Sequence, residues 1–68
     1  MIAATPRHAL LTEREFQVIA CLSHGLRYKG TADLLGISVR TVSVHARNVF
    51  DKLDVHKISD VVRIIYMG

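Results

Sequence analysis

Apolar residues recur at the three- and four-residue spacing of a helix face in four separate segments of the chain. The predicted helices span about residues 13–24, 28–35, 39–53 and 59–67. The only strand-like alternation, at 42–44, lies inside a longer helical pattern. The pattern therefore predicts an all-α fold of four helices.

Helix boundaries are marked by specific residues. Thr12 and Glu15 have the spacing of a capping box, and Leu11 and Phe16 flank it like a hydrophobic staple. Gly25 can adopt the left-handed conformation that ends a helix. We therefore expect the first helix to start at residue 13 and to end near residue 24.

The second and third segments are predicted to form a helix-turn-helix. Gly36 lies where a tight turn needs a positive φ, and Ser38 is the expected N-cap of the third helix. Ala32 is small where the two helices must approach, and Val42 can fill the space between them. Short helices joined by a glycine-containing turn are typical of DNA-binding proteins, although an ordinary helical hairpin has the same pattern.

The face of the third helix opposite its apolar stripe mixes cationic and apolar side chains. Val44 lies between Arg40 and Arg47, with Asn48 and Asp51 on the same face. A helix that reads the major groove needs this mixture, because arginine binds guanine or phosphate and apolar groups contact the thymine methyl. A stray surface valine is the competing interpretation.

The last helix is predicted to be apolar on two sides, starting near Ser59 as its cap. Its first apolar face consists of Val61, Ile64 and Ile65, and its second of Val62 and Tyr66. A short terminal helix cannot bury both faces in a small core. We therefore expect Val62 and Tyr66 to form a dimer interface.

Length and composition narrow the function further. The chain has 68 residues, enough for one domain, and nine Lys and Arg against six Asp and Glu, a net charge of +3 that suits a polyanion. Cys21 is the only cysteine, so no internal disulfide can form, and we expect a reduced core thiol. The four histidines are scattered, so we expect no enzyme, no metal and no cofactor.

Neither a membrane span nor a signal peptide is predicted, because no apolar run approaches about 20 residues. We therefore expect a cytoplasmic protein with no membrane partner. Residues 1–10 are predicted to be a flexible lead-in or linker, and residues 11–68 a helix-turn-helix DNA-binding domain.

Several motifs together resemble a known family. They are Leu11-Thr12-Glu13-Arg14-Glu15, Gly25-Leu26, the run from Leu35 to His45, and Lys52-Leu53. This combination, over about residues 11–66, resembles the LuxR-type (GerE-like) DNA-binding domain of bacterial transcription regulators. The resemblance implies a third helix in the major groove and a fourth helix that forms a twofold dimer.

The resemblance also implies roles for individual residues. Base contacts are implied for Ser43, Val44 and Arg47, and DNA backbone contacts for Lys29, Arg40, Thr41 and Lys52. Phosphate contacts set the register of a protein on DNA, while base contacts specify sequence. His45 matches a family histidine, for which packing with one hydrogen bond and DNA contact are both open.

The chain departs from the family pattern at the start of the second helix. Residues 27–32 read Arg-Tyr-Lys-Gly-Thr-Ala where the family usually has Ser-Asn-Lys-Glu-Ile-Ala. The cap of this helix is lost, which weakens the expected contact from its backbone amides to phosphate. Ser43 replaces a frequent lysine, Asp54 a usual glycine, and Lys57 a small polar cap.

Two functions from different classes follow. The first is sequence-specific binding of double-stranded DNA by a homodimer, with RNA polymerase or a related regulator as candidate protein partners. The second is a small protein-interaction module that pairs with a larger related regulator through its last helix and binds DNA weakly or not at all.

Overall fold

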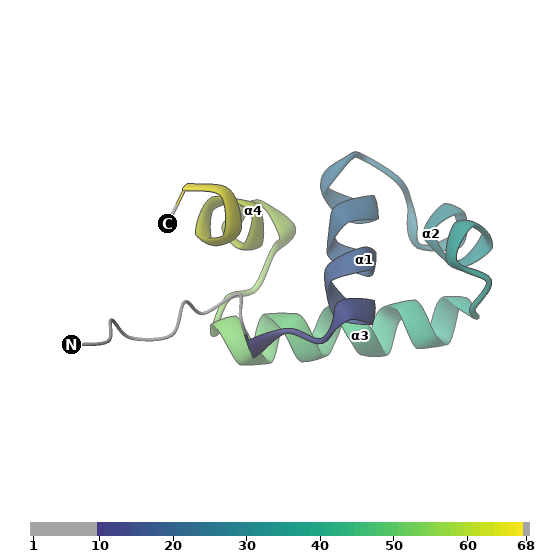
Figure 1. Cartoon of the computed structure of the whole chain (residues 1–68), viewed down its shortest axis with the longest axis horizontal. Helices are drawn as coiled ribbons and strands as arrows, with labels where there is room; N and C mark the ends of the chain where they lie inside the picture. The colour runs from purple at the N-terminus through teal and green to yellow at the C-terminus, as the bar shows by residue number, and fades with distance from the viewer. Residues whose placement is uncertain (1–9, 68) are drawn as a thin grey trace.

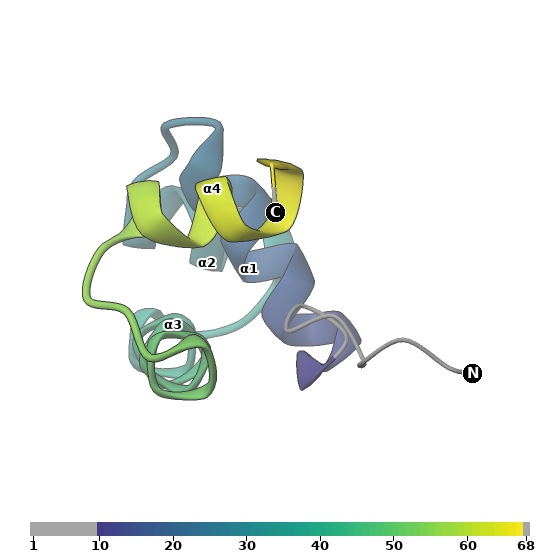
Figure 2. The ribbon, with the colours of Figure 1, turned by 90° about the vertical axis from the view of Figure 1, so that its left-hand side faces the viewer.

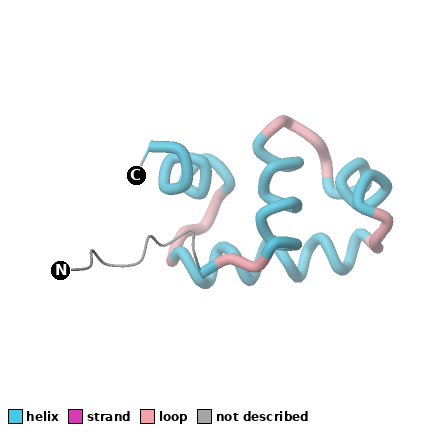
Figure 3. Tube along the Cα trace, in the orientation of Figure 1, coloured by secondary structure: helices cyan, strands magenta, loops and turns pink. Residues whose placement is uncertain are grey.

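The computed structural model describes residues 10–67 and consists of four helices joined by short turns (Figures 1 and 3). They are α1 (Glu13–Ser23), α2 (Tyr28–Leu35), α3 (Val39–Leu53) and α4 (Ile58–Met67). Within residues 10–67 there is no strand. The predicted all-α fold is confirmed. Apart from Leu10, the lead-in predicted for residues 1–10 lies outside the described residues.

The predicted start of α1 is confirmed atom by atom. The Thr12 hydroxyl accepts a hydrogen bond from the Glu15 backbone N–H at 3.1 Å, and the Glu15 carboxylate accepts one from the Thr12 N–H at 2.9 Å. At the other end, Gly25 has a φ of 90°, the conformation expected after the helix. The last helical residue is Ser23, one residue earlier than predicted.

The start of α4 differs from the prediction, which placed the cap at Ser59. The Lys57 carbonyl accepts the first helical hydrogen bonds, from the backbone N–H groups of Asp60 and Val61 at 3.1 and 3.4 Å. The helix therefore begins at Ile58, and Ser59 lies inside its first turn. The cap prediction for Ser59 was wrong.

Helix α3 is the base on which the other helices lie. Figure 1 shows α1 crossing the middle of α3, with α2 beside its N-terminal end and α4 beside its C-terminal end. Figure 2 looks along α3 and shows the other three helices on one side of it. The opposite side of α3 is therefore covered by none of the described helices.

The core consists of two clusters that share α3. The cluster below α4 contains Leu11, Ile19, Val49, Leu53 and Val61, and the cluster below α2 contains Val18, Ala32, Val42 and Ala46. Burial of these apolar side chains is the main force that holds such short helices together. Because α3 contributes residues to both clusters, packing fixes the position of α3 along its whole length.

The two faces of α4 differ as predicted. Val61 is fully buried, and Ile64 and Ile65 pack against the core. On the second face Val62 is half-buried and Tyr66 is 63% exposed.

None of the helices in the described part of the chain has both the length and the apolar character needed to span a membrane.

Candidate nucleic-acid interface

The turn between α2 and α3 has the predicted helix-turn-helix geometry. Gly36 adopts the left-handed conformation, with φ 69° and ψ 33°, and the Ile37 N–H donates to the Ala32 carbonyl at 3.0 Å. Ala32 and Val42 are both buried and belong to the same cluster. This packing sets the angle at which α3 leaves the turn.

The N-terminus of α3 is capped and open to solvent. The Ser38 hydroxyl accepts a hydrogen bond from the Thr41 N–H at 3.0 Å and lies 2.9 Å from the Thr41 hydroxyl, so the predicted cap is confirmed. The first turn contains no acidic residue. The helix dipole therefore favours an anion at this end.

The outer face of α3 presents the predicted base-contact residues to solvent. Ser43, Val44 and Arg47 are exposed, Val44 by 50%. Arg40 is exposed as well, and neither its guanidinium nor that of Arg47 has a hydrogen bond or ion pair to any residue in 10–67. Two unpaired guanidinium groups therefore lie beside an apolar contact point on the uncovered side of the helix.

Two of the predicted backbone-contact residues, Lys29 and Thr41, lie on different helices of the helix-turn-helix. Lys29, near the start of α2, is exposed and lies 3.6 Å from Asp33, a surface ion pair of the kind that contributes little. Thr41 is half-buried at the start of α3.

Lys52 has intramolecular partners that the sequence did not indicate. Its ammonium donates to the Glu15 carboxylate at 2.7 Å and to the Leu10 carbonyl at 3.2 Å. The Lys52 side chain is 34% exposed, whereas Glu15 is almost fully buried. Glu15 and Lys52 are 37 positions apart, so helical spacing carried no signal of the pair. The predicted DNA contact of Lys52 stays a prediction.

The environment of Glu15 keeps its carboxyl group ionised. Burial raises the pKa of Glu15, but the hydrogen bond from Lys52, the Thr12 N–H and the charges of Lys52 and His45 lower it more strongly. The net effect is a pKa below the usual value of 4.5. The ion pair with Lys52 is therefore intact at neutral pH.

His45 has its Nδ1 atom buried, and this atom has no hydrogen-bond partner among residues 10–67. Its ring is half-buried on the flank of α3. The half-buried ring agrees with the packing interpretation, although Nδ1 makes no hydrogen bond within residues 10–67, and the DNA contact of His45 stays a prediction.

The start of α2 is uncapped, as predicted. Arg27 occupies the N-cap position with φ −82° and ψ 170°, and its side chain makes no capping hydrogen bond.

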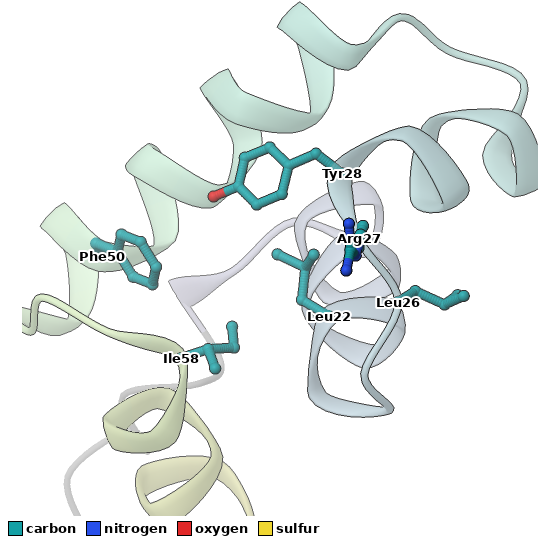
Figure 4. Close-up of a pocket in the computed structure, with 6 residues that line it drawn as sticks. All are labelled: Leu22, Leu26, Arg27, Tyr28, Phe50 and Ile58. Carbon is teal, nitrogen blue, oxygen red and sulfur yellow. The ribbon is translucent and has the colours of Figure 1, made fainter.

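Next to Arg27 lies an open apolar groove of about 390 Å³ that could not be predicted from the sequence (Figure 4). Its lining comes from all four helices and the turn after α1: Leu22, Leu26, Arg27, Tyr28, Phe50 and Ile58. In Figure 4 the Tyr28 ring reaches from α2 toward α3.

A second hollow lies at the C-terminal end of α3 and shares Phe50 with the groove. It is lined by Arg47, Phe50, Asp51, Asp54, Val55 and His56. Asp54 ends α3 in the left-handed conformation, with a φ of 57°. In the described part of the chain no three His, Cys, Asp or Glu side chains are grouped to hold a metal ion.

Comparison with known proteins links this architecture to bacterial regulators. The family described as bacterial regulatory proteins, luxR family, matches residues 9–65. The transcriptional regulatory protein FixJ of Azorhizobium caulinodans is 45% identical over 62 residues, which cover 91% of this chain and 29% of FixJ. The nitrate/nitrite response regulator protein NarP of Escherichia coli is 49% identical over 47 residues, 69% of this chain and 22% of NarP.

A third relative matches over most of the chain. The transcriptional regulatory protein UhpA of Escherichia coli is 38% identical over 65 residues, 96% of this chain and 33% of UhpA. The chain thus spans about a third or less of the length of these relatives. No solved structure gave a significant match.

Proposed function

The chain belongs to the luxR family of bacterial regulatory proteins and carries its DNA-binding domain, and from this premise we propose that it binds double-stranded DNA sequence-specifically. Helix α3 enters the major groove. Ser43, Val44 and Arg47 contact base edges, and the backbone contacts come from Lys29, Arg40, Thr41 and Lys52. In a bacterium this function places the protein in the cytoplasm.

One observation carries the proposal. The unpaired guanidinium groups of Arg40 and Arg47 lie on either side of the exposed Val44, on the side of α3 that the other helices leave uncovered. Arginine can form two hydrogen bonds with guanine, and valine can contact a thymine methyl group. An ordinary solvated helix face has no need of a half-exposed valine between two arginines.

The proposed DNA complex is a twofold dimer formed through α4. Tyr66 and Val62 give this helix a second apolar face outside the core. Pairing of two such faces is isologous and would present two α3 helices to half-sites about 34 Å apart. Tyr66→Ser should then weaken self-association in sedimentation velocity, whereas Tyr28→Ser, which changes a tyrosine outside α4, should leave it unchanged.

The test of DNA binding uses fluorescence anisotropy with a duplex selected from a random pool and with an unselected duplex. Arg47→Ala should cost about 1–3 kcal/mol on the selected duplex and reduce the preference for it. Arg14→Ala removes the same charge from a residue of α1 that is outside α3 and serves as the control. Equal effects of the two substitutions, or no preference by the unsubstituted chain, would contradict the proposal.

The uncapped start of α2 favours a second candidate function. In it the chain pairs through α4 with a larger related regulator and binds DNA poorly by itself. Capture of a full-length LuxR-family regulator that is lost with Tyr66→Ser but kept with Arg47→Ala would favour this function. RNA polymerase is a further candidate partner, to be tested in the same capture experiment.

A further inference from the structure

The ammonium of Lys52 is held by two acceptors and has one donor left. A lysine ammonium carries three N–H groups. Two of them point to the Glu15 carboxylate, at 2.7 Å, and to the Leu10 carbonyl, at 3.2 Å. With a third of the side chain exposed, the remaining N–H has room for an external acceptor.

Glu15 is itself a fixed group. Its carboxylate also accepts the Thr12 N–H at 2.9 Å, and its side chain is 4% exposed in the first turn of α1. A lysine on a helix surface otherwise samples many rotamers and loses that freedom when it binds. Glu15 thus reduces the entropy that Lys52 would lose on meeting a ligand.

The position of Lys52 on α3 indicates which ligand this is. Thr41, Asn48 and Lys52 follow one another at spacings of seven and four residues, so they lie along one flank of the helix. This flank borders the outer face that carries Arg40 and Arg47. When α3 lies in a major groove, a flank of this kind faces the phosphates of one strand.

Building on the proposed DNA binding, we infer that Glu15 is a positioning residue for the DNA backbone: it holds the Lys52 ammonium so that the free N–H donates to a phosphate. Glu15 itself does not contact the DNA. Substitution of Glu15 changes DNA affinity in opposite directions for a positioning role and for a role as a negative charge only. Removing a carboxylate near DNA tightens binding by charge alone, whereas loss of a positioning group weakens it.

The experiment measures the dissociation constant for the selected duplex at several salt concentrations. Glu15→Gln should weaken binding about two- to tenfold, the cost of immobilising a lysine that is no longer held. The slope of the logarithm of the binding constant against the logarithm of the salt concentration should become less steep. It should approach the slope of Lys52→Gln, which loses about one phosphate contact. The matched control is Glu13→Gln, an exposed carboxylate in the same helical turn, which should leave binding unchanged or slightly tighter.

A double variant tests the route of the effect. In a Lys52→Gln background, Glu15→Gln should no longer weaken binding, because the group it positions is gone. All variants are compared at a temperature where circular dichroism shows each to be folded. If Glu15→Gln does not fold, Glu15→Asp replaces it: charge alone predicts no change, and positioning predicts weaker binding.

Tighter binding by Glu15→Gln, matching Glu13→Gln, would overturn the inference. So would a weakening that persists undiminished in the Lys52→Gln background. Failure of the underlying DNA-binding proposal has a different signature, because the unsubstituted chain would then show no preference for the selected duplex.

Discussion

The two helices of the helix-turn-helix are held in different ways. Helix α3 has a side-chain cap at Ser38 and an ion pair near its other end, where Lys52 meets Glu15. Helix α2 starts at Tyr28, its N-cap residue Arg27 makes no side-chain cap, and Gly30 lies in its first turn. What holds α2 is burial, since Thr31 and Ala32 are almost fully covered.

Helix α3 thus has a side-chain cap and an ion pair in addition to its buried face, whereas α2 has a buried face and no side-chain N-cap. A cap contributes about 1 kcal/mol wherever the helix lies. Burial contributes only while the partner surface stays in place. Substitutions at the contact between the helices should therefore affect α2 most, and substitutions at helix ends should have smaller and opposite effects on α2 and α3.

The largest effect is expected from Val42→Ala, which removes the side chain packed between α2 and α3. Val42 is fully buried. Loss of two methyl groups and the resulting cavity should lower the free energy of unfolding by about 3 kcal/mol. Urea denaturation measures it, and Val44→Ala, on the exposed face of the same helix, should change stability by less than about 0.5 kcal/mol. Equal decreases in the free energy of unfolding for the two variants would contradict the stabilising role of the contact between α2 and α3.

The next largest is expected from Glu15→Gln, which removes the ion pair that holds α3. At pH 7 it should cost about 2 kcal/mol, a typical value for a hydrogen bond to a charged group. The pKa of Glu15 is lowered in the folded state, so this stabilisation is complete above the unfolded value of about 4.5 and is lost as the pH falls through the folded pKa.

The measurement for that prediction is urea denaturation between pH 7 and pH 3. The difference between the unsubstituted chain and Glu15→Gln should shrink below about pH 4.5 as the carboxyl group of Glu15 becomes protonated. Glu13→Gln should keep the pH dependence of the unsubstituted chain. A difference that stays constant down to pH 3 would contradict the assigned role of the ion pair.

Helix caps should give a smaller pair of effects with opposite signs. Ser38→Ala removes the cap of α3 and should lower stability by about 1 kcal/mol. Arg27→Ser introduces a cap at α2, where the backbone is already extended, and should raise stability by about 0.5–1 kcal/mol. Thermal unfolding followed by circular dichroism measures both. If Arg27→Ser left stability unchanged, the missing side-chain cap would not weaken α2.

The smallest effect is expected from Gly30→Ala within α2. An added Cβ would lie 3.5 Å from Leu26 Cδ2, an ordinary contact. The substitution should therefore raise stability by about 0.5–1 kcal/mol through higher helix propensity. The control is Gly36→Ala, which should destabilise because Gly36 has a φ of 69°. Destabilisation by Gly30→Ala would show that α2 needs its glycine.

Features that depend on neighbours in the chain could be predicted from the sequence. The capping box of Thr12 and Glu15, the turn at Gly36 and the cap at Ser38 each involve residues no more than five positions apart. Their geometry follows from local backbone chemistry. The exposed face of α3 could be predicted for the same reason, because helical periodicity determines which side chains share a face.

Features that depend on how helices pack could not be predicted. Glu15 was assigned only a capping role, although the same carboxylate also binds Lys52 on another helix. The groove beside Tyr28 and Phe50 is assembled from all four helices. The start of α4 was misplaced because Ser59 is a good cap by type, whereas the backbone enters the helix at Ile58.

The arrangement of α3 has a consequence for how such a domain can change over generations. Its core stripe, with Val42, Val49 and Leu53, shares no position with the exposed stripe of Val44 and Arg47. Replacements on the outer stripe leave the packed residues untouched, so under the proposed function the preferred DNA sequence can change while the fold is kept. The proposal thus assigns stability and DNA-sequence preference to separate faces of one helix.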